Sequence, residues 1–100
     1  MILVQLVYLR PGQQATFDAF EDTALARVVA HGGEILARLR AGPVALIAGS
    51  LEPPDEVHII SFPDRDAFAR YAADPERQRV LHLKDAAVRT TWLIEGERIA

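Results

Sequence analysis

The order of hydrophobic patterns along this chain of 100 residues predicts a single α+β domain. Short stretches that alternate between apolar and polar residues, as strands do, are separated by longer stretches with the period of an amphipathic helix. Half of the residues are hydrophobic and a quarter are charged, which is the balance of a globular protein rather than of a disordered segment. The chain is short for two domains, so we expect one domain over residues 1–100.

The N-terminal third predicts a strand followed by a helix. Residues 2–9 are apolar on both faces apart from Gln5, which is typical of a central strand that is covered on both sides. Residues 13–31 have a helical period, with their large apolar side chains in one stripe. Gly32 and Gly33 end this helix, because glycine readily adopts the left-handed conformation that follows a helix C-terminus.

The middle of the chain predicts a second strand and a long connection. Residues 34–40 alternate between a mostly polar face, which carries Arg38, and an apolar face. The apolar face is formed by Ile35, Ala37 and Leu39. We expect another extended run from Val44 to Leu51, and Pro53 and Pro54 then require a loop, since proline is excluded from the interior of a sheet.

The C-terminal half predicts a strand, two helices and a last strand. A strand is expected at 57–62, and Asp64 is a favourable N-cap for the helix after it. Asp74 is the clearest local signal, because the proline and glutamate that follow it suit the first turn of a helix. This second helix is expected to continue through Val88, and the last strand to cover 89–95.

The resulting order of elements is that of the split βαβ motif of ferredoxin-like folds, with an antiparallel sheet. The predicted helices suffice to cover one face of a four-stranded sheet. The first strand, however, is apolar on both faces. We therefore expect a second copy of the same sheet to cover the other face, in a homodimer closed by two-fold symmetry.

The composition excludes several classes of function. A formal charge of -3 lacks the basic footprint of a nucleic-acid-binding protein. The absence of cysteine excludes disulfides, thiolate metal centres and a cysteine nucleophile. The N-terminal residues lack the features of a signal peptide, and no apolar run reaches the roughly 18 residues of a bilayer span. We expect a cytoplasmic protein that binds neither nucleic acid nor membrane.

Several short motifs resemble a small bacterial family of unknown function. They are His31-Gly32-Gly33 followed by Leu36 and Arg38, then Phe62-Pro63, Asp74-Pro75-Glu76 and Ile94-Glu95-Gly96. That family belongs to the dimeric α/β-barrel superfamily, which also contains antibiotic-biosynthesis monooxygenases and muconolactone isomerases. The resemblance runs from about Phe17 to Gly96. It implies a homodimeric α/β barrel that binds or transforms a small organic metabolite between helices and sheet, without a tightly bound cofactor.

Three residues depart from the pattern of that family. Ser61 stands where a glutamate is frequent, Lys84 where an arginine is common, and Arg77 where an aromatic residue is frequent. If the family shares a chemistry of carboxylate and guanidinium groups, this chain lacks part of it. The segment 56–58, Glu-Val-His, brings an imidazole close to the position of the missing carboxylate.

His58 and Arg38 are the main candidates for a catalytic or binding role. His58 shares its strand parity with Ile60 and Phe62, so it is expected on a largely apolar face, where an imidazole can act as a general base or anchor a polar ligand. The alternative is a histidine whose hydrogen bonds are satisfied by a neighbour. Arg38 either holds a carboxylate or enolate oxygen of a ligand, or pairs with Glu34, Glu56 or a residue of the second subunit.

The remaining candidates are less specific. His31 is a third candidate for catalysis, and its alternative is a packed imidazole at a helix C-terminus. Tyr71 and Trp92 are aromatic residues that can form walls of a ligand pocket, or belong to a core or interface. The three histidines lack the spacing of a metal site, so none is expected. Two functions remain open: an enzyme of the monooxygenase or isomerase type, and a non-catalytic ligand-binding or structural dimer.

Overall fold

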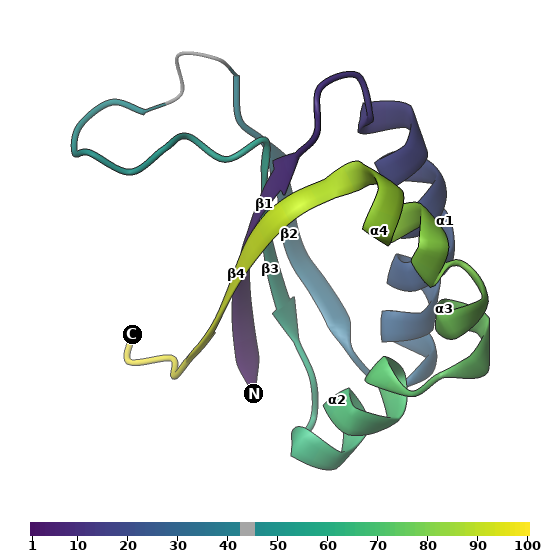
Figure 1. Ribbon diagram of the computed structural model, residues 1–100. Coiled ribbons are helices and arrows are strands. Elements are labelled where there is room, and N and C mark those ends of the chain that lie inside the picture. The colour runs from purple at the N-terminus through teal and green to yellow at the C-terminus, as the bar shows by residue number, and fades with distance from the viewer. Residues whose placement is uncertain (43–45) are drawn as a thin grey trace.

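The computed structural model describes residues 1–42 and 46–100. It shows a four-stranded antiparallel sheet that is covered by helices on one face (Figure 1). The strands are β1 (Ile2–Leu9), β2 (Glu34–Arg40), β3 (Glu56–Ser61) and β4 (Val88–Gly96). The helices are α1 (Gln14–Ala30), α2 (Arg65–Ala72), α3 (Pro75–Arg79) and α4 (Leu81–Ala87). The strand order β2-β3-β1-β4 confirms the predicted α+β class and the split βαβ pattern.

β1 lies in the middle of the sheet, between β3 and β4. Its residues Leu3 and Val7 face the helices and are buried. Their neighbours Ile2, Val4 and Leu6 point to the opposite face, where they are half-buried. Both faces of the strand are therefore apolar, as predicted, but the helices cover only one. We call the uncovered side the open face.

The core between sheet and helices consists of two hydrophobic clusters. One is formed by Val7, Phe17, Phe20, Ala24 and Ala87. The other is formed by Leu3, Val28, Phe62 and Ala67. α1 contributes to both clusters, because its predicted apolar stripe runs along the whole length of the helix.

The turn after α1 depends on its two glycines. Gly32 has a φ of 78°, which is the left-handed conformation expected after a helix. Gly33 permits a close approach, since a Cβ atom there would lie 2.7 Å from Val28 Cγ1 and 2.9 Å from the Ser61 carbonyl oxygen. This contact lets β2 begin directly beneath the end of α1.

The prediction of an extended run from Val44 to Leu51 is wrong for its described part. Residues 46–51 form bends and no strand, and Ile47 is 99% exposed. Gly49 has a φ of 103°, so the chain turns away from the sheet instead of pairing with it. Val44 lies outside the described residues. Figure 1 shows this connection projecting from the sheet.

The expected second helix is also divided. It breaks at Val80 into α3 and α4, and Val88 is already the first residue of β4. The break changes the direction of the chain (Figure 1), so that Leu81 and Leu83 pack on the first core cluster. Packing of these side chains against the core thus overrides a continuous helical pattern.

β2 contains an irregularity that its sequence hides. The register of its pairing with β3 shifts between Ile35 and Ala37. Ile35 therefore packs in the core beside Ile60, whereas Ala37 and Leu39 lie on the open face. The prediction that these three residues share one face is wrong. The same shift places Arg38 opposite His58, on the helix-covered face.

Candidate functional site

The carboxylate of Glu56 is the centre of a polar cluster on the helix-covered face of the sheet. Its Oε1 atom lies 2.7 Å from Arg38 Nε and 2.8 Å from His58 Nε2. Its Oε2 atom accepts a hydrogen bond of 2.7 Å from Gln14 Nε2 of α1. Glu56 and His58 are each only 1% exposed. We call Glu56, His58 and Arg38 the Glu56 cluster.

The protonation of Glu56 follows from these contacts. Burial by itself would raise the pKa of this carboxyl group, but the hydrogen bonds from His58, Arg38 and Gln14 lower the pKa to about 2. Glu56 is therefore ionised at neutral pH and can only accept hydrogen bonds. The proton in the contact with His58 then belongs to Nε2 of the imidazole.

Arg38 is occupied by protein groups. Besides its bonds to Glu56, it donates to Asp18 Oδ1 at 3.0 Å, and its guanidinium carbon lies 5.9 Å from the ring centre of Phe17. This arrangement matches the pairing with Glu56 that the sequence left open for Arg38. It orients the carboxylate and through it the imidazole.

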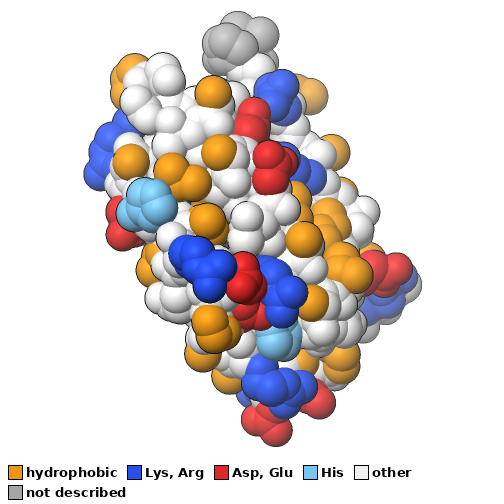
Figure 2. Space-filling view, turned by 90° about the vertical axis from the view of Figure 1, so that its right-hand side faces the viewer, with side chains coloured by type: hydrophobic (Ala, Val, Ile, Leu, Met, Phe, Trp, Pro, Cys, Tyr) orange, Lys and Arg blue, Asp and Glu red, His pale blue; other side chains and the backbone are white. Residues whose placement is uncertain are grey.

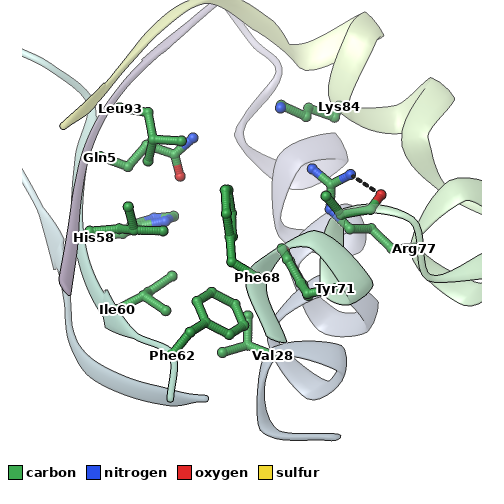
Figure 3. A pocket seen from close by; sticks show the side chains of 12 residues that line it. Gln5, Val28, His58, Ile60, Phe62, Phe68, Tyr71, Arg77, Lys84 and Leu93 are labelled. Carbon is green, nitrogen blue, oxygen red and sulfur yellow. Dashed lines mark hydrogen bonds between the residues drawn. The ribbon is translucent and has the colours of Figure 1, made fainter. Parts of the chain in front are cut away.

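The imidazole of His58 is held flat in the core and borders a cavity. Its ring stacks on Phe17, with centroids 6.0 Å apart and an interplanar angle of 23°. The ring also borders a cavity of about 110 Å³ between the sheet and the four helices. Figure 3 shows the His58 side chain extending from β3 toward this space.

The wall of the cavity is mostly apolar. Its apolar side chains include Leu3, Ile60, Phe62, Phe68 and Leu93. Its polar side chains are Gln5, His58, Tyr71, Arg77 and Lys84. The two kinds are arranged unevenly, because Gln5 and His58 come from the sheet, whereas the other three polar groups come from the helices on the far side (Figure 3). A space of this size is comparable to the cavity of about 150 Å³ that can hold a benzene ring.

The helix side of the cavity carries two cationic groups. The guanidinium carbon of Arg77 lies 5.1 Å from the ring centre of Tyr71 and 5.8 Å from that of Phe20. Its NH1 group donates to the Ala72 carbonyl oxygen at 3.4 Å. Burial lowers the pKa of Lys84, and the like charge of Arg77 lowers it further.

Glu21 is a buried carboxylic acid near these groups. It is 6% exposed and, among the described residues, forms no ion pair. Burial raises its pKa, and the positive charges of the surrounding residues offset that effect only in part. α1 thus places an acidic side chain without a charged partner between the Glu56 cluster and Lys84.

The structure brings together only some of the predicted site residues. Arg38 and His58 share the Glu56 cluster, and Tyr71 lines the cavity. Trp92 pairs with Leu6 across the sheet, so it lies on the open face and cannot be a wall of this cavity. Trp92 was expected to form a pocket wall together with Tyr71, but β4 directs its side chain to the opposite face of the sheet.

His31 belongs to a second cluster, whose residues do not line the cavity. Its Nε2 atom lies 2.7 Å from Asp74 Oδ2, which also accepts a bond of 2.8 Å from Arg27 Nε. The other oxygen of Asp74 accepts from the backbone N–H of Glu76 at 2.7 Å and so caps α3. The hydrogen bond from His31, with the others, holds the pKa of Asp74 well below its usual range. We call Asp74, His31 and Arg27 the Asp74 cluster.

Residues 6–97 of the chain match the model of a known protein family. This family model is described as "Domain of unknown function (DUF1330)". The chain belongs to this family. The resemblance to a small family of unknown function is thereby confirmed. No curated protein matches the sequence significantly.

Solved structures show the same fold as this DUF1330 chain. A protein of unknown function from Rhodopseudomonas palustris, RPA0582, has a TM-score of 0.80 at 24% identity, covering 93% of this chain and 77% of its own. A dabb family protein with a ferredoxin-like fold from Mesorhizobium loti has a TM-score of 0.68 at 16% identity, covering 99% and 96%. SnoaB, a cofactor-independent oxygenase from Streptomyces nogalater, has a TM-score of 0.62 at 17% identity, covering 97% and 92%. These likenesses confirm the ferredoxin-like fold.

Four residues in or near the cavity of this DUF1330 chain were not predicted from the sequence as site residues. They are Gln5, Glu21, Arg77 and Lys84. Gln5 had a signal, because it is the single polar residue in a strand that is otherwise apolar. Arg77 and Lys84 also had one, since both depart from the pattern of the family. Glu21 had none, because an acidic residue next to a helical apolar stripe usually faces solvent.

Within residues 1–42 and 46–100, no three histidine or acidic side chains converge in a group that could hold a metal ion. His82 of this DUF1330 chain is exposed on α4. No described helix combines the length and apolar character that crossing a membrane requires.

Proposed function

We propose that this protein binds a small organic molecule in the cavity between sheet and helices and uses His58 to move a proton to or from it, with its own side chains and no tightly bound cofactor. The observation that carries the proposal is the position of His58. One ring nitrogen contacts the ionised Glu56, and the ring borders a largely apolar cavity. Such a pair of carboxylate and imidazole is suited to general acid–base catalysis.

The proposed step uses the second nitrogen of the ring. In the neutral form of the ring, Glu56 holds the proton on Nε2, and Nδ1 then carries the free lone pair. A C–H or O–H bond of the ligand breaks, its proton moves to Nδ1, and the electron pair remains on the ligand as an enolate or oxyanion. The imidazolium that forms is stabilised by the adjacent carboxylate. Return of the proton to another carbon completes an isomerisation.

The similar fold of SnoaB supports this type of reaction, because that protein is described as a cofactor-independent oxygenase. In both an oxygenase and an isomerase of this kind, removal of a proton makes the ligand electron-rich. Its conversion by side chains then depends on a dry pocket and a positioned base. The mostly apolar wall of the cavity beside His58 supports such a reaction here.

The isomerisation of 3-cyclopenten-1-one to the conjugated 2-cyclopenten-1-one tests the proposal. This ring ketone is about the size of benzene, and the product is followed by its ultraviolet absorbance. We expect the protein to accelerate the reaction, and His58→Gln to abolish the acceleration, because the glutamine amide can donate to Glu56 but cannot accept a proton. His82→Gln, on the exposed face of α4, is the matched control and should be fully active.

Two results would overturn the proposed catalysis. If NMR spectra show that the ring ketone shifts the resonances of cavity residues but is not isomerised, the protein is a non-catalytic binding module. Equal rates for the wild type and His58→Gln, with unchanged circular dichroism, would mean that His58 is structural.

We also propose that the working unit is a homodimer joined through the open faces of two sheets, in the cytoplasm. Trp92, Ile94 and Leu39 are 59%, 51% and 55% exposed on this face of a single chain. On the helix side, by contrast, charged groups of both signs are interspersed with hydrophobic ones (Figure 2). Soluble monomers rarely expose a continuous apolar patch larger than a few hundred Å². A two-fold contact covers this patch and leaves none exposed.

Sedimentation at micromolar concentration tests the dimer. We expect about twice the chain mass for the wild type and the mass of one chain for Trp92→Lys, since burial of an unpaired charge in an apolar interface is unfavourable. Ile47→Lys changes a side chain that is 99% exposed in the loop before β3, and should remain dimeric. A monomeric wild type would contradict the proposal.

A further inference from the structure

We propose that Arg77 and Lys84 form an anion subsite on the helix side of the cavity, and that the ligand is therefore a small organic acid with a planar apolar body. This inference rests on the proposed function, because it assigns the ligand of the same cavity. It concerns two residues that take no part in the proton transfer to His58.

The first observation is the state of Arg77. Among the described residues, its Nε is the one buried side-chain nitrogen or oxygen without a hydrogen-bond partner. The guanidinium is also fixed in place, because it packs against the rings of Tyr71 and Phe20 and donates to the Ala72 carbonyl oxygen. Because Nε is enclosed by protein, the part of Arg77 that can meet a ligand in the cavity is the terminal end of the guanidinium, which is held in place and carries its charge.

The second observation is the state of Lys84. It forms no ion pair with any residue that the structure describes, although α4 places it in the wall of the cavity. Arg77 and Lys84 come from two different helices and lie on the same side of the cavity in Figure 3. Two positive groups that repel each other in a partly dry pocket favour an anion between them.

Three acidic residues lie near this subsite. Asp74 accepts from the backbone N–H of Arg77 at 3.4 Å, but its carboxylate is already hydrogen-bonded to Arg27 and His31. Glu21 of α1 and Asp85 of α4 are the acidic residues that act on Lys84, and neither lies close enough to form an ion pair with it. Asp85 is exposed, so solvent screens its charge. Glu21 is buried and opposes an anionic ligand when it is ionised.

The rest of the cavity indicates the remainder of the ligand. Phe68 stands between the sheet side and the helix side of the cavity, and Ile60 and Phe62 provide apolar surfaces next to His58 and below it (Figure 3). A hydrated inorganic anion would leave these surfaces without contacts, whereas a planar ring or unsaturated chain would fill them. A carboxylate held by Arg77 and Lys84 directs such a body across the cavity toward the imidazole of the Glu56 cluster.

Calorimetry with benzoate and its neutral isostere benzamide tests this subsite. We expect benzoate to bind at least about tenfold more tightly than benzamide, with an affinity that falls as salt is added. Arg77→Met and Lys84→Met should each weaken benzoate about tenfold or more and leave benzamide unchanged. Arg79→Met is the matched control, because Arg79 lies on α3 but its guanidinium pairs with Glu76 at the surface, 70% exposed. Glu21→Gln should tighten benzoate.

The outcomes separate the two proposals. The anion subsite would be overturned if benzoate and benzamide bound equally tightly and neither Arg77→Met nor Lys84→Met changed their affinities. The cavity would then still be a binding site. Failure of both compounds to bind, with no isomerisation of the ring ketone, would overturn the proposed function itself.

Discussion

The Glu56 cluster and the Asp74 cluster contain the same three kinds of side chain, a histidine, a carboxylate and an arginine. In each, one carboxylate oxygen lies within 2.8 Å of a histidine nitrogen and of an arginine nitrogen. In each, these hydrogen bonds lower the pKa of the carboxyl group. Their chemical composition therefore does not distinguish a functional site from a structural one.

The two clusters differ in what their histidine and their carboxylate contact next. His58 borders a cavity, and its carboxylate contacts only side chains. The His31 side chain is 20% exposed at the C-terminus of α1, and its carboxylate caps α3. The Asp74 cluster thus joins two helices, whereas the Glu56 cluster presents an oriented imidazole to an open space. This comparison favours the Glu56 cluster as the functional one.

The largest effect is expected for Glu56→Gln. The pKa of Glu56 falls from 4.5 to about 2 on folding, which corresponds to roughly 3 kcal/mol of stability at neutral pH. Because the folded-state pKa is lowered, this stability is present above the unfolded pKa and is lost as the pH falls from about 5 to about 2. Urea unfolding should show a large loss for the variant at pH 7 and a difference that shrinks in acid. A constant difference across this range would contradict the assigned ionisation.

A smaller loss of stability is expected for Asp74→Asn, without loss of ligand binding. The asparagine can still cap α3, but it loses the charge that pairs with His31 and Arg27. We expect the melting temperature to fall by several degrees at pH 7, since one lost kcal/mol shifts it by about 4–8 °C in a domain of this size. Benzoate affinity should be unchanged. A clear loss of benzoate affinity in Asp74→Asn would remove the distinction between the clusters.

The smallest change, and one of opposite sign, is expected for Glu21→Gln. Burial raises the pKa of this group, so its stabilising contribution is present below the unfolded pKa and is lost as the pH rises through the folded pKa. Removing the charge should therefore raise the melting temperature by a few degrees at pH 7 and leave it nearly unchanged at pH 4. A lower melting temperature at pH 7 would show that Glu21 has a stabilising partner.

The elements that depend on local chemistry could be predicted from the sequence. Asp64 and Asp74 cap their helices, and Gly32 ends α1, because each signal acts within a few residues. The irregularity in β2 could not be predicted, since residues 34–40 alternate without interruption and only the register against β3 reveals it. Packing likewise divided the helix at Val80.

The site was predictable to the extent that it depends on strand parity. Because His58 alternates in step with Ile60 and Phe62, it was expected on the same apolar face, and its ring is buried on the helix-covered face. The sequence did not say which face of β4 would be covered, so it could not place Trp92. Nor could it bring together Arg77 and Lys84, because their convergence depends on the break between α3 and α4. Contacts between distant elements are the part that sequence patterns leave open.

The central claim is that the imidazole of His58, and not that of His31, meets a ligand. Nitrogen-15 NMR of the imidazole rings during titration with cyclopentanone, the saturated analogue that has no double bond to isomerise, tests this claim most directly. We predict that the Nδ1 resonance of His58 shifts with saturation while the resonances of His31 and His82 stay in place. No shift at His58, or an equal shift at His31, would contradict it.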